Sequence, residues 1–219
     1  MTSIVTPSIP PDAQPAPAVQ GSTSIRGLWA TWRSWTNRIF ALREDQLFLF
    51  LAVLIGIFSG LAVVCFRILI EWVHLAFLGS SIDPPLLRVL IVPVAGGLVV
   101  ALLVIHVFPA ARGSGVNQTK SAVYISNGYI PFNTVVGKFL VCALGIGTGQ
   151  SLGPEDPSLQ IGAGIASHLG RRLNLSQEKI RLIAPVGAAA GLAAAFNAPI
   201  SSVIFVIEEV IGTWSAGVL

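Results

Sequence analysis

The sequence predicts an all-α, polytopic membrane protein in which some of the helices are broken and tilted. Of its 219 residues, 53% are hydrophobic and only 11% are charged, whereas soluble domains carry about 25% charged residues. So few charges cannot cover the surface of a soluble protein, and the high apolar content excludes disorder over most of the chain. The third observation is an order: long apolar runs come first, and shorter runs interrupted by glycine and proline follow.

Two segments precede the apolar runs. Residues 1–22 contain five prolines among Ser, Thr, Ala and Gln, and we expect a disordered, Pro-rich cytoplasmic tail. In residues 23–44, Trp29, Trp32 and Trp35 recur at every third position among four arginines. This pattern favours an interfacial amphipathic helix in the headgroup layer, with a plain juxtamembrane linker as the alternative.

Two apolar runs are long enough to cross a bilayer, which takes about 20 residues. Residues 46–66 carry no charge, and this helix can continue past Arg67 as a long, tilted span. After a break at residues 83–85, residues 86–108 predict a second span, which Pro93 kinks or flexes.

Beyond these spans the apolar stretches are short. Several cannot cross the hydrocarbon unaided, and non-helical backbone at membrane depth persists only where protein buries it or where it lines a wet cavity. Broken helices of this kind are typical of transporter binding sites; packing helices without transport function are the alternative. The stretches are residues 121–128, 131–149, 158–169, 182–195 and 199–211.

The positions of lysine and arginine predict the orientation of the chain. The arginines of residues 23–44 place the N-terminus in the cytoplasm, and two spans return the chain to that side near Arg112. The basic loop of residues 171–181 also belongs inside, so residues 153–157 lie toward the outer side. After Arg181 the chain crosses toward the outer side and returns, which places Glu209 toward the inner side.

Three short segments are predicted to start helices that face an interior site. The first contains Gly113, Ser114 and Gly115, where glycine lets the backbone approach a ligand and the serine offers a hydroxyl. Free amides and the positive end of the helix dipole make such a start an anion site, although an ordinary loop has the same sequence features.

The second segment is residues 153–157, Gly-Pro-Glu-Asp-Pro. A carboxylate at the bilayer centre costs about 2.5–3.5 kcal/mol, while a helix N-terminus returns about 0.3–1 kcal/mol. Capping alone therefore does not explain two acidic residues at depth; either they reach a water-filled vestibule or one has a function. Asp156 is the better candidate for capping, and Glu155 for a mobile proton-accepting group.

The third segment, residues 196–199, puts Pro199 in the first turn of a helix that ends in Glu208-Glu209. Carboxylates at a helix C-terminus meet the unfavourable end of the dipole, so they are either exposed to solvent or handle protons. Lys138 lies in an apolar stretch, where it either raises the positive potential for an anion or extends to the membrane interface.

An enzyme is not indicated, because the sequence shows no nucleophile–base pair and no cluster of metal ligands. Cys65 and Cys142 lack the spacing of a disulfide framework or a zinc site, and we interpret them as packing residues. We expect no cofactor, no metal and no nucleic-acid partner.

At the three helix starts the sequence resembles the CLC family of voltage-gated chloride channels and chloride/proton antiporters. Residues 113–117 look like the family's Gly-Ser-Gly-Ile-Pro anion motif, and residues 153–157 look like its Gly-Lys/Arg-Glu-Gly-Pro motif. Residues 189–199, continuing to Glu208-Glu209, give the longest match. The departures from the motifs are Asn117 in place of Pro, Pro154 in place of Lys or Arg, and Asp156 in place of Gly.

The resemblance implies roles for residues at these helix starts. The hydroxyl of Ser114 would contact the central anion, the carboxylate of Glu155 would gate the anion path and exchange a proton with the outside, and Glu209 would be the inner proton glutamate of antiporters. The other residues implied are Gly113 and Gly115 for the anion site, and Gly153, Asp156 and Pro157 for the gate region.

By the same resemblance, residues 45–219 would form the first half of a membrane domain built from two inverted halves. We therefore expect a truncated chain that does not transport ions alone. The whole protein would be a homodimer in the lipid bilayer of a bacterial-type plasma membrane, and it would exchange chloride for protons. Two alternatives remain open: a passive voltage-gated chloride channel of the same family, and a non-transporting membrane scaffold or sensor.

Overall fold

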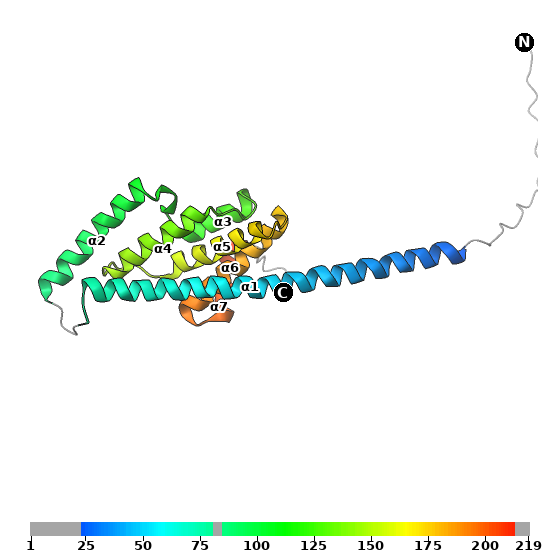
Figure 1. The fold of residues 1–219 in the computed structure, drawn as a ribbon, viewed down its shortest axis with the longest axis horizontal. Helices are drawn as coiled ribbons and strands as arrows, with labels where there is room; N and C mark the ends of the chain where they lie inside the picture. The colour runs from blue at the N-terminus through cyan, green and yellow to red at the C-terminus, as the bar shows by residue number, and fades with distance from the viewer. Residues whose placement is uncertain (1–22, 81–84, 213–219) are drawn as a thin grey trace, which may run out of the picture. The chain divides into compact units, whose positions relative to one another are not determined.

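The computed structural model describes residues 23–80 and 85–212, and all regular structure in these ranges is helical, as predicted. The chain divides into two units, Met1–Leu47 and Phe48–Leu219. The elements in chain order (Figure 1) are α1 Thr23–Phe77, α2 Leu86–His106, the 3₁₀ turn η1 Pro109–Ala111, α3 Gly115–Ile125, α4 Phe132–Gly147, α5 Glu155–Arg172, α6 Gln177–Phe196, α7 Pro199–Phe205 and the π-helical turn η2 Val206–Ile211.

In the first unit the backbone is helical from Thr23 onward. Residues 23–44 are therefore helical, as expected, and α1 continues to Phe77 without ending before the first span. That residues 23–44 lie in the headgroup layer stays a prediction. The expected disordered tail, residues 1–22, lies outside the described residues.

Three helical segments of the second unit are long and apolar enough to cross a membrane: Phe48–Phe77, Leu86–His106 and Gln177–Phe196. The first two confirm the predicted spans, and the second runs through Pro93 without a break in the helix. The third is α6, which begins five residues before the apolar stretch of residues 182–195 and ends one residue after it.

The start of α6 corrects the expected basic loop of residues 171–181. Ser176 caps the helix by accepting a hydrogen bond from the Lys179 amide at 3.4 Å, so the charged residues that follow Ser176 form the first turn of α6. The prediction of a loop used the charged residues alone, and a helix start can carry as many charges as a loop. The missed signal is Ser176, because serine is a common residue at a helix N-cap.

Arg67 lies inside the first span, and its charge has a partner on α6. Its Nη1 atom donates to the carbonyl oxygen of Ala195 at 3.0 Å. This carbonyl belongs to the last turn of α6, where the helix dipole favours a cation. The contact explains how the first span continues past Arg67, its first charged residue, as predicted.

Several other helices are too short to span the hydrocarbon, in agreement with the predicted broken helices. At about 1.5 Å per residue, the 11 residues of α3 extend about 16 Å and the 16 residues of α4 about 24 Å, against a hydrocarbon thickness of about 30 Å. The helix that begins at Pro199 has 7 residues before it passes into η2.

The core of the second unit lies around α5, which packs against α3, α4 and α6. Pro157 and most of the residues after it in α5 are buried. Large apolar side chains of α1 and α2 are exposed instead, including Phe50, Leu86 and Leu98. Exposed apolar faces of this extent are typical of surfaces that contact lipid.

Helices α5 and α6 approach each other closely at their glycines. A Cβ atom on Gly187 would collide with the carbonyl oxygen of Gly162, and one on Gly191 would collide with the carbonyl oxygen of Ser158. Small residues let helix backbones come this close in membrane proteins. The contact fixes the position of α5 and therefore of its first turn.

Replacing Gly187 by alanine should destabilise the protein, because the added methyl group has no space next to the Gly162 carbonyl. Overpacking of this kind costs about 1–3 kcal/mol. The matched control is Gly56→Ala, where a methyl group meets no atom within 4 Å and alanine favours the helix. Thermal unfolding in detergent should show a lower midpoint for Gly187→Ala alone; equal midpoints for the two variants would contradict the packing described.

Candidate functional site

The first predicted segment is indeed a helix start. Gly113 adopts a φ of 88°, a left-handed conformation that favours glycine. Ser114 follows as the N-cap of α3, and its Oγ accepts a hydrogen bond from the Asn117 amide at 3.4 Å. The next two amides, of Gly115 and Val116, have no partner within the helix because the first turn of any α-helix leaves its donors free.

The carboxylate of Asp156, at the start of α5, lies on these free donors. Its Oδ1 accepts from the Ser114 hydroxyl at 2.7 Å and from the Val116 amide at 3.1 Å. Its Oδ2 accepts from the Gly115 amide at 2.6 Å. Hydrogen bonds to an ionised acceptor are roughly twice as strong as neutral ones, so the start of α3 is a strong binding place for a negative group.

Lys138, from the middle of α4, supplies a positive charge to the same place. Its Nζ lies 3.5 Å from Oδ2 of Asp156 and donates to the Gly113 carbonyl oxygen. The side chain of Lys138 is only 4% exposed, whereas that of Asp156 is 36% exposed. Of the two alternatives left open for this lysine, the structure supports the one in which it raises the positive potential of an interior site.

The capping role expected for Asp156 is found on a neighbouring helix. Its own helix, α5, begins after Pro154 without a side-chain hydrogen bond at the cap. Gly115 allows the two helix starts to meet, since a Cβ atom there would lie 2.6 Å from the main-chain oxygen of Asp156 and 2.8 Å from Oε1 of Gln160. The first and second predicted segments are therefore in direct contact.

Glu155 has different surroundings from its neighbour. Its side chain is exposed and turns back over Gly153, against which its carboxylate group lies. Pro157, the last residue of the expected gate region, is buried in the first turn of α5. The structure thus places one carboxylate of the pair on the start of α3 and the other on the exposed side of the same turn.

The third predicted segment differs from expectation in its end. Asn197 ends α6 with a φ of 54°, and Pro199 opens α7 in its first turn as predicted. The expected continuous helix instead changes into the π-helical turn η2, which contains Glu208 and Glu209. Both carboxylates are exposed, and the hydroxyl of Tyr124 on α3 donates to the Ile211 carbonyl oxygen at the end of this turn.

Gln160 is a residue of the site that the sequence analysis did not identify. It is buried one turn after Asp156, and its Nε2 donates to Oε1 of Gln118 on α3 at 2.5 Å. Its own Oε1 has no hydrogen-bond partner among the described residues. The signal in the sequence is a lone glutamine four residues after an aspartate in a run of small and apolar residues, which places both on one helix face.

A polar cavity of about 230 Å³ borders Gln160. It has room for several water molecules, each of which takes about 30 Å³ of liquid volume. The polar residues in its lining are Gln118, Ser121, Ser126, Tyr129, Thr134 and Gln160.

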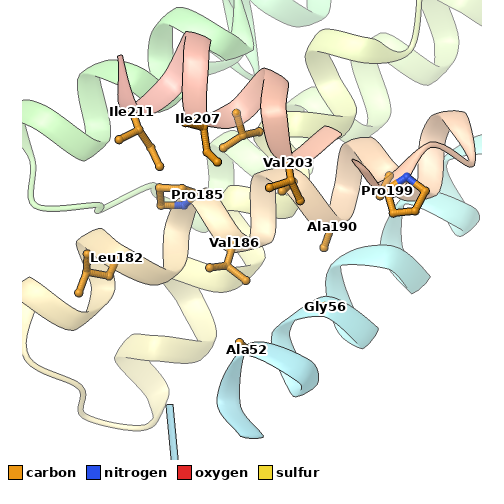
Figure 2. A pocket seen from close by; sticks show the side chains of 13 residues that line it. Ala52, Gly56, Leu182, Pro185, Val186, Ala190, Pro199, Val203, Ile207 and Ile211 are labelled. Atoms are coloured by element: carbon orange, nitrogen blue, oxygen red, sulfur yellow. The ribbon is translucent and has the colours of Figure 1, made fainter. Parts of the chain in front are cut away.

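A second cavity, of about 400 Å³, lies between α1, α6, α7 and η2 (Figure 2). Side chains such as Leu182, Val203 and Ile207 line it, and its lining holds no charged or hydroxyl side chain. An ion would find no partner there, so this apolar cavity is excluded as an ion site.

Long apolar spans and broken helices define the chain as a multi-spanning membrane protein, and the start of its helix α3 binds a negatively charged side chain. The family model described as "Voltage gated chloride channel" matches residues 96–219, more than half of the chain. The chain therefore belongs to this family and is an integral membrane protein. The resemblance inferred from the three motifs is confirmed.

Curated relatives carry the names of both transporters and channels. The chain is 32% identical over 173 residues to the "H(+)/Cl(-) exchange transporter ClcA" of Salmonella schwarzengrund, covering 74% of this chain and 36% of that protein. It is 30% identical over 177 residues to "Chloride channel protein CLC-e" of Arabidopsis thaliana, covering 73% of this chain and 24% of that protein.

Solved structures agree with the predicted CLC-type fold. A CLC-type fluoride/proton antiporter matches with a TM-score of 0.63 and 25% identity, over 75% of this chain and 40% of the other. A slow cyanobacterial Cl⁻/H⁺ antiporter matches with a TM-score of 0.61 and 31% identity, over 74% and 40%. The chain thus spans 24–40% of the length of these four relatives.

The contact between Lys138 and Asp156 predicts energetic coupling between them. Lys138→Met and Asp156→Asn should each destabilise the protein, because each leaves the other charge without its partner. The double variant should lose less than the sum of the single losses. We expect a coupling of about 1 kcal/mol, close to values for exposed pairs because Asp156 is partly open to solvent.

Unfolding in mixed micelles with increasing SDS measures this coupling as a double-mutant cycle. A cycle that is additive within about 0.4 kcal/mol would show that the two charges do not interact.

Proposed function

We propose that the chain forms part of the ion pathway of a chloride/proton antiporter, with the start of α3 as an anion site. The observation that carries the proposal is the carboxylate bound by the Ser114 hydroxyl, two main-chain amides and the buried Lys138. A halide needs the same kind of donors as a carboxylate. The antiporters among the relatives support the choice of reaction.

Glu155 is the gating glutamate in this proposal. Its assignment comes from the match of residues 153–157 to the family motif, and its exposed carboxylate, in the same first turn of α5 as Asp156, supports the role. An exposed carboxylate can exchange a proton with water, and its uncharged form does not compete with an anion. Protonation of Glu155 would therefore open the path to chloride.

Glu209 takes the role of the inner proton glutamate. Its exposure in η2 supports this role, because a proton donor must reach water on the side that supplies it. The orientation inferred from lysine and arginine puts Glu209 toward the cytoplasm and Glu155 toward the outside, with the N-terminus inside. A homodimer in a bacterial-type plasma membrane completes the proposal.

A passive chloride channel is the second candidate, and the Arabidopsis relative named as a chloride channel favours it. The two functions differ in the reversal potential measured in liposomes under opposed chloride and proton gradients. Coupled exchange shifts this potential when the pH gradient changes, whereas a passive chloride conductance does not respond. A non-transporting scaffold would give no flux in either gradient.

Replacing Glu155 by glutamine should abolish proton transport while chloride still passes, because glutamine cannot carry a proton between the two sides. Chloride and proton fluxes are measured together in liposomes that contain the reconstituted protein. Glu208→Gln is the control, since Glu208 is an exposed acidic residue with no assigned role. Proton flux that survives undiminished in Glu155→Gln would show that the coupling assignment is wrong.

A further inference from the structure

Two arginines and two tyrosines, the arginine–tyrosine cluster, lie where α5 ends and α6 begins. The guanidinium carbon of Arg171 lies 4.3 Å from the centre of the Tyr129 ring, and that of Arg181 lies 5.7 Å from the centre of the Tyr124 ring. Both distances are within the limit of about 6 Å for a cation–π contact. An aromatic ring thus holds each guanidinium group and leaves its N–H groups available to a ligand.

The loop between α3 and α4 brings the two halves of the cluster together. Tyr124 lies in the last turn of α3, and Tyr129 follows in this loop. The loop packs directly on the start of α6, since a Cβ atom on Gly128 would lie 2.8 Å from the Cα atom of Arg181. The fold itself therefore positions the four side chains, and this preorganisation lowers the cost of binding a ligand.

The two arginines have no acidic partner in the part of the chain that the structure describes. Both are exposed, and no carboxylate of these residues lies within ion-pair distance of them. The nearby Glu178 is exposed and unpaired with either. The helix dipole favours Arg171 in the last turn of α5, but it does not favour a cation such as Arg181 near the start of α6.

The charge and shape of these groups favour a phosphate ligand. Residues 171–181 contain four basic residues and one acidic residue, so this surface attracts anions. A guanidinium group is planar and donates two parallel hydrogen bonds to a phosphate, which a lysine cannot do. Two preoriented arginines without acidic partners therefore form a better site for phosphate groups than for a single atomic anion.

The position of the cluster indicates that the phosphate belongs to a lipid. Helix α6 is one of the helices long and apolar enough to cross a membrane, and the cluster lies at its start. Large apolar side chains beside the basic residues are exposed, with Leu173 at 51% and Leu182 at 62%. Tyrosine and arginine next to exposed apolar groups are typical of the membrane–water interface, whereas a soluble polyanion does not need the apolar groups.

We propose that the arginine–tyrosine cluster binds the phosphate headgroup of an anionic phospholipid in the leaflet that α6 enters. The orientation predicted from lysine and arginine makes this the cytoplasmic leaflet, where anionic lipids are found. The bound lipid would stabilise the contact between the α3–α4 loop and the start of α6. The cluster shares no residue with the proposed anion site, so this inference is independent of the proposed function.

The test compares phosphatidylglycerol, which is anionic, with zwitterionic phosphatidylcholine in detergent micelles at fixed pH, ionic strength and lipid-to-detergent ratio. A ligand that binds the folded state raises the unfolding midpoint. We expect phosphatidylglycerol to raise the midpoint of the wild type by about 3 °C more than phosphatidylcholine does. Arg171→Gln combined with Arg181→Gln should abolish this difference. Equal midpoints of the wild type in the two lipids overturn the proposal, and so does a difference that the double variant keeps.

Matched variants locate the effect. Arg88→Gln is the control for Arg181→Gln, since it removes one exposed arginine at the start of α2, outside the cluster. A loss of the lipid difference in this control as large as in Arg181→Gln would show a general effect of charge and refute the proposal. Tyr129→Phe should keep the difference and Tyr129→Leu should reduce it, because only an aromatic ring holds Arg171. Equal responses of these two variants refute the proposed role of the tyrosine.

Native mass spectrometry counts bound lipids and does not depend on stability. The wild type should retain more phosphatidylglycerol than the double variant, or than Arg181→Gln alone if the double variant cannot be purified; equal retention overturns the proposal. Heparin added to phosphatidylcholine micelles tests a soluble polyanion, and stabilisation as large as that by phosphatidylglycerol would refute a lipid site. None of these measurements needs ion transport, so absence of exchange activity in liposomes refutes the proposed function alone.

Discussion

The structure depends on how the free amides at the start of α3 are satisfied. A helix start needs acceptors for its unpaired donors, and here one carboxylate accepts from the Gly115 and Val116 amides. Asp156 joins α5 to α3 through three hydrogen bonds and to α4 through Lys138. One acidic side chain therefore connects three helices, and its removal affects their packing and the charge of the site together.

Close packing of backbones makes this contact possible. The glycine contact between Gly162 and Gly187 sets α5 against α6, and Gly115 leaves the space in which α3 receives the first turn of α5. Large apolar side chains of α1 and α2, such as Phe50 and Leu86, are exposed instead. The interior of the second unit is thus formed from small residues and a few partnered polar groups, in the way expected when lipid surrounds the protein.

Features that depend on neighbours in the sequence could be predicted. The uncharged run before Arg67, the helix start near Ser114 and the proline that opens α7 could all be predicted, because spans and helix starts are local patterns. Contacts between distant segments could not be derived. No local sequence pattern near Lys138 indicates that Asp156 is its partner. No local pattern indicates the contact between Gln160 and Gln118 either, because they lie 42 residues apart. The π-helical turn around Glu209 also left no local signal, since its sequence resembles that of an ordinary apolar helix.

The two adjacent carboxylates at the start of α5 have different surroundings, and that of Asp156 is the one that lies on the start of α3 in this structure. Consecutive residues of a helix point about 100° apart, so a first turn that directs Asp156 to the amides directs Glu155 away from them, over Gly153. Pro157 limits the freedom of this turn because its ring fixes φ. The two carboxylates therefore differ in their surroundings. Asp156 pairs with the buried Lys138, and Glu155 is exposed to solvent.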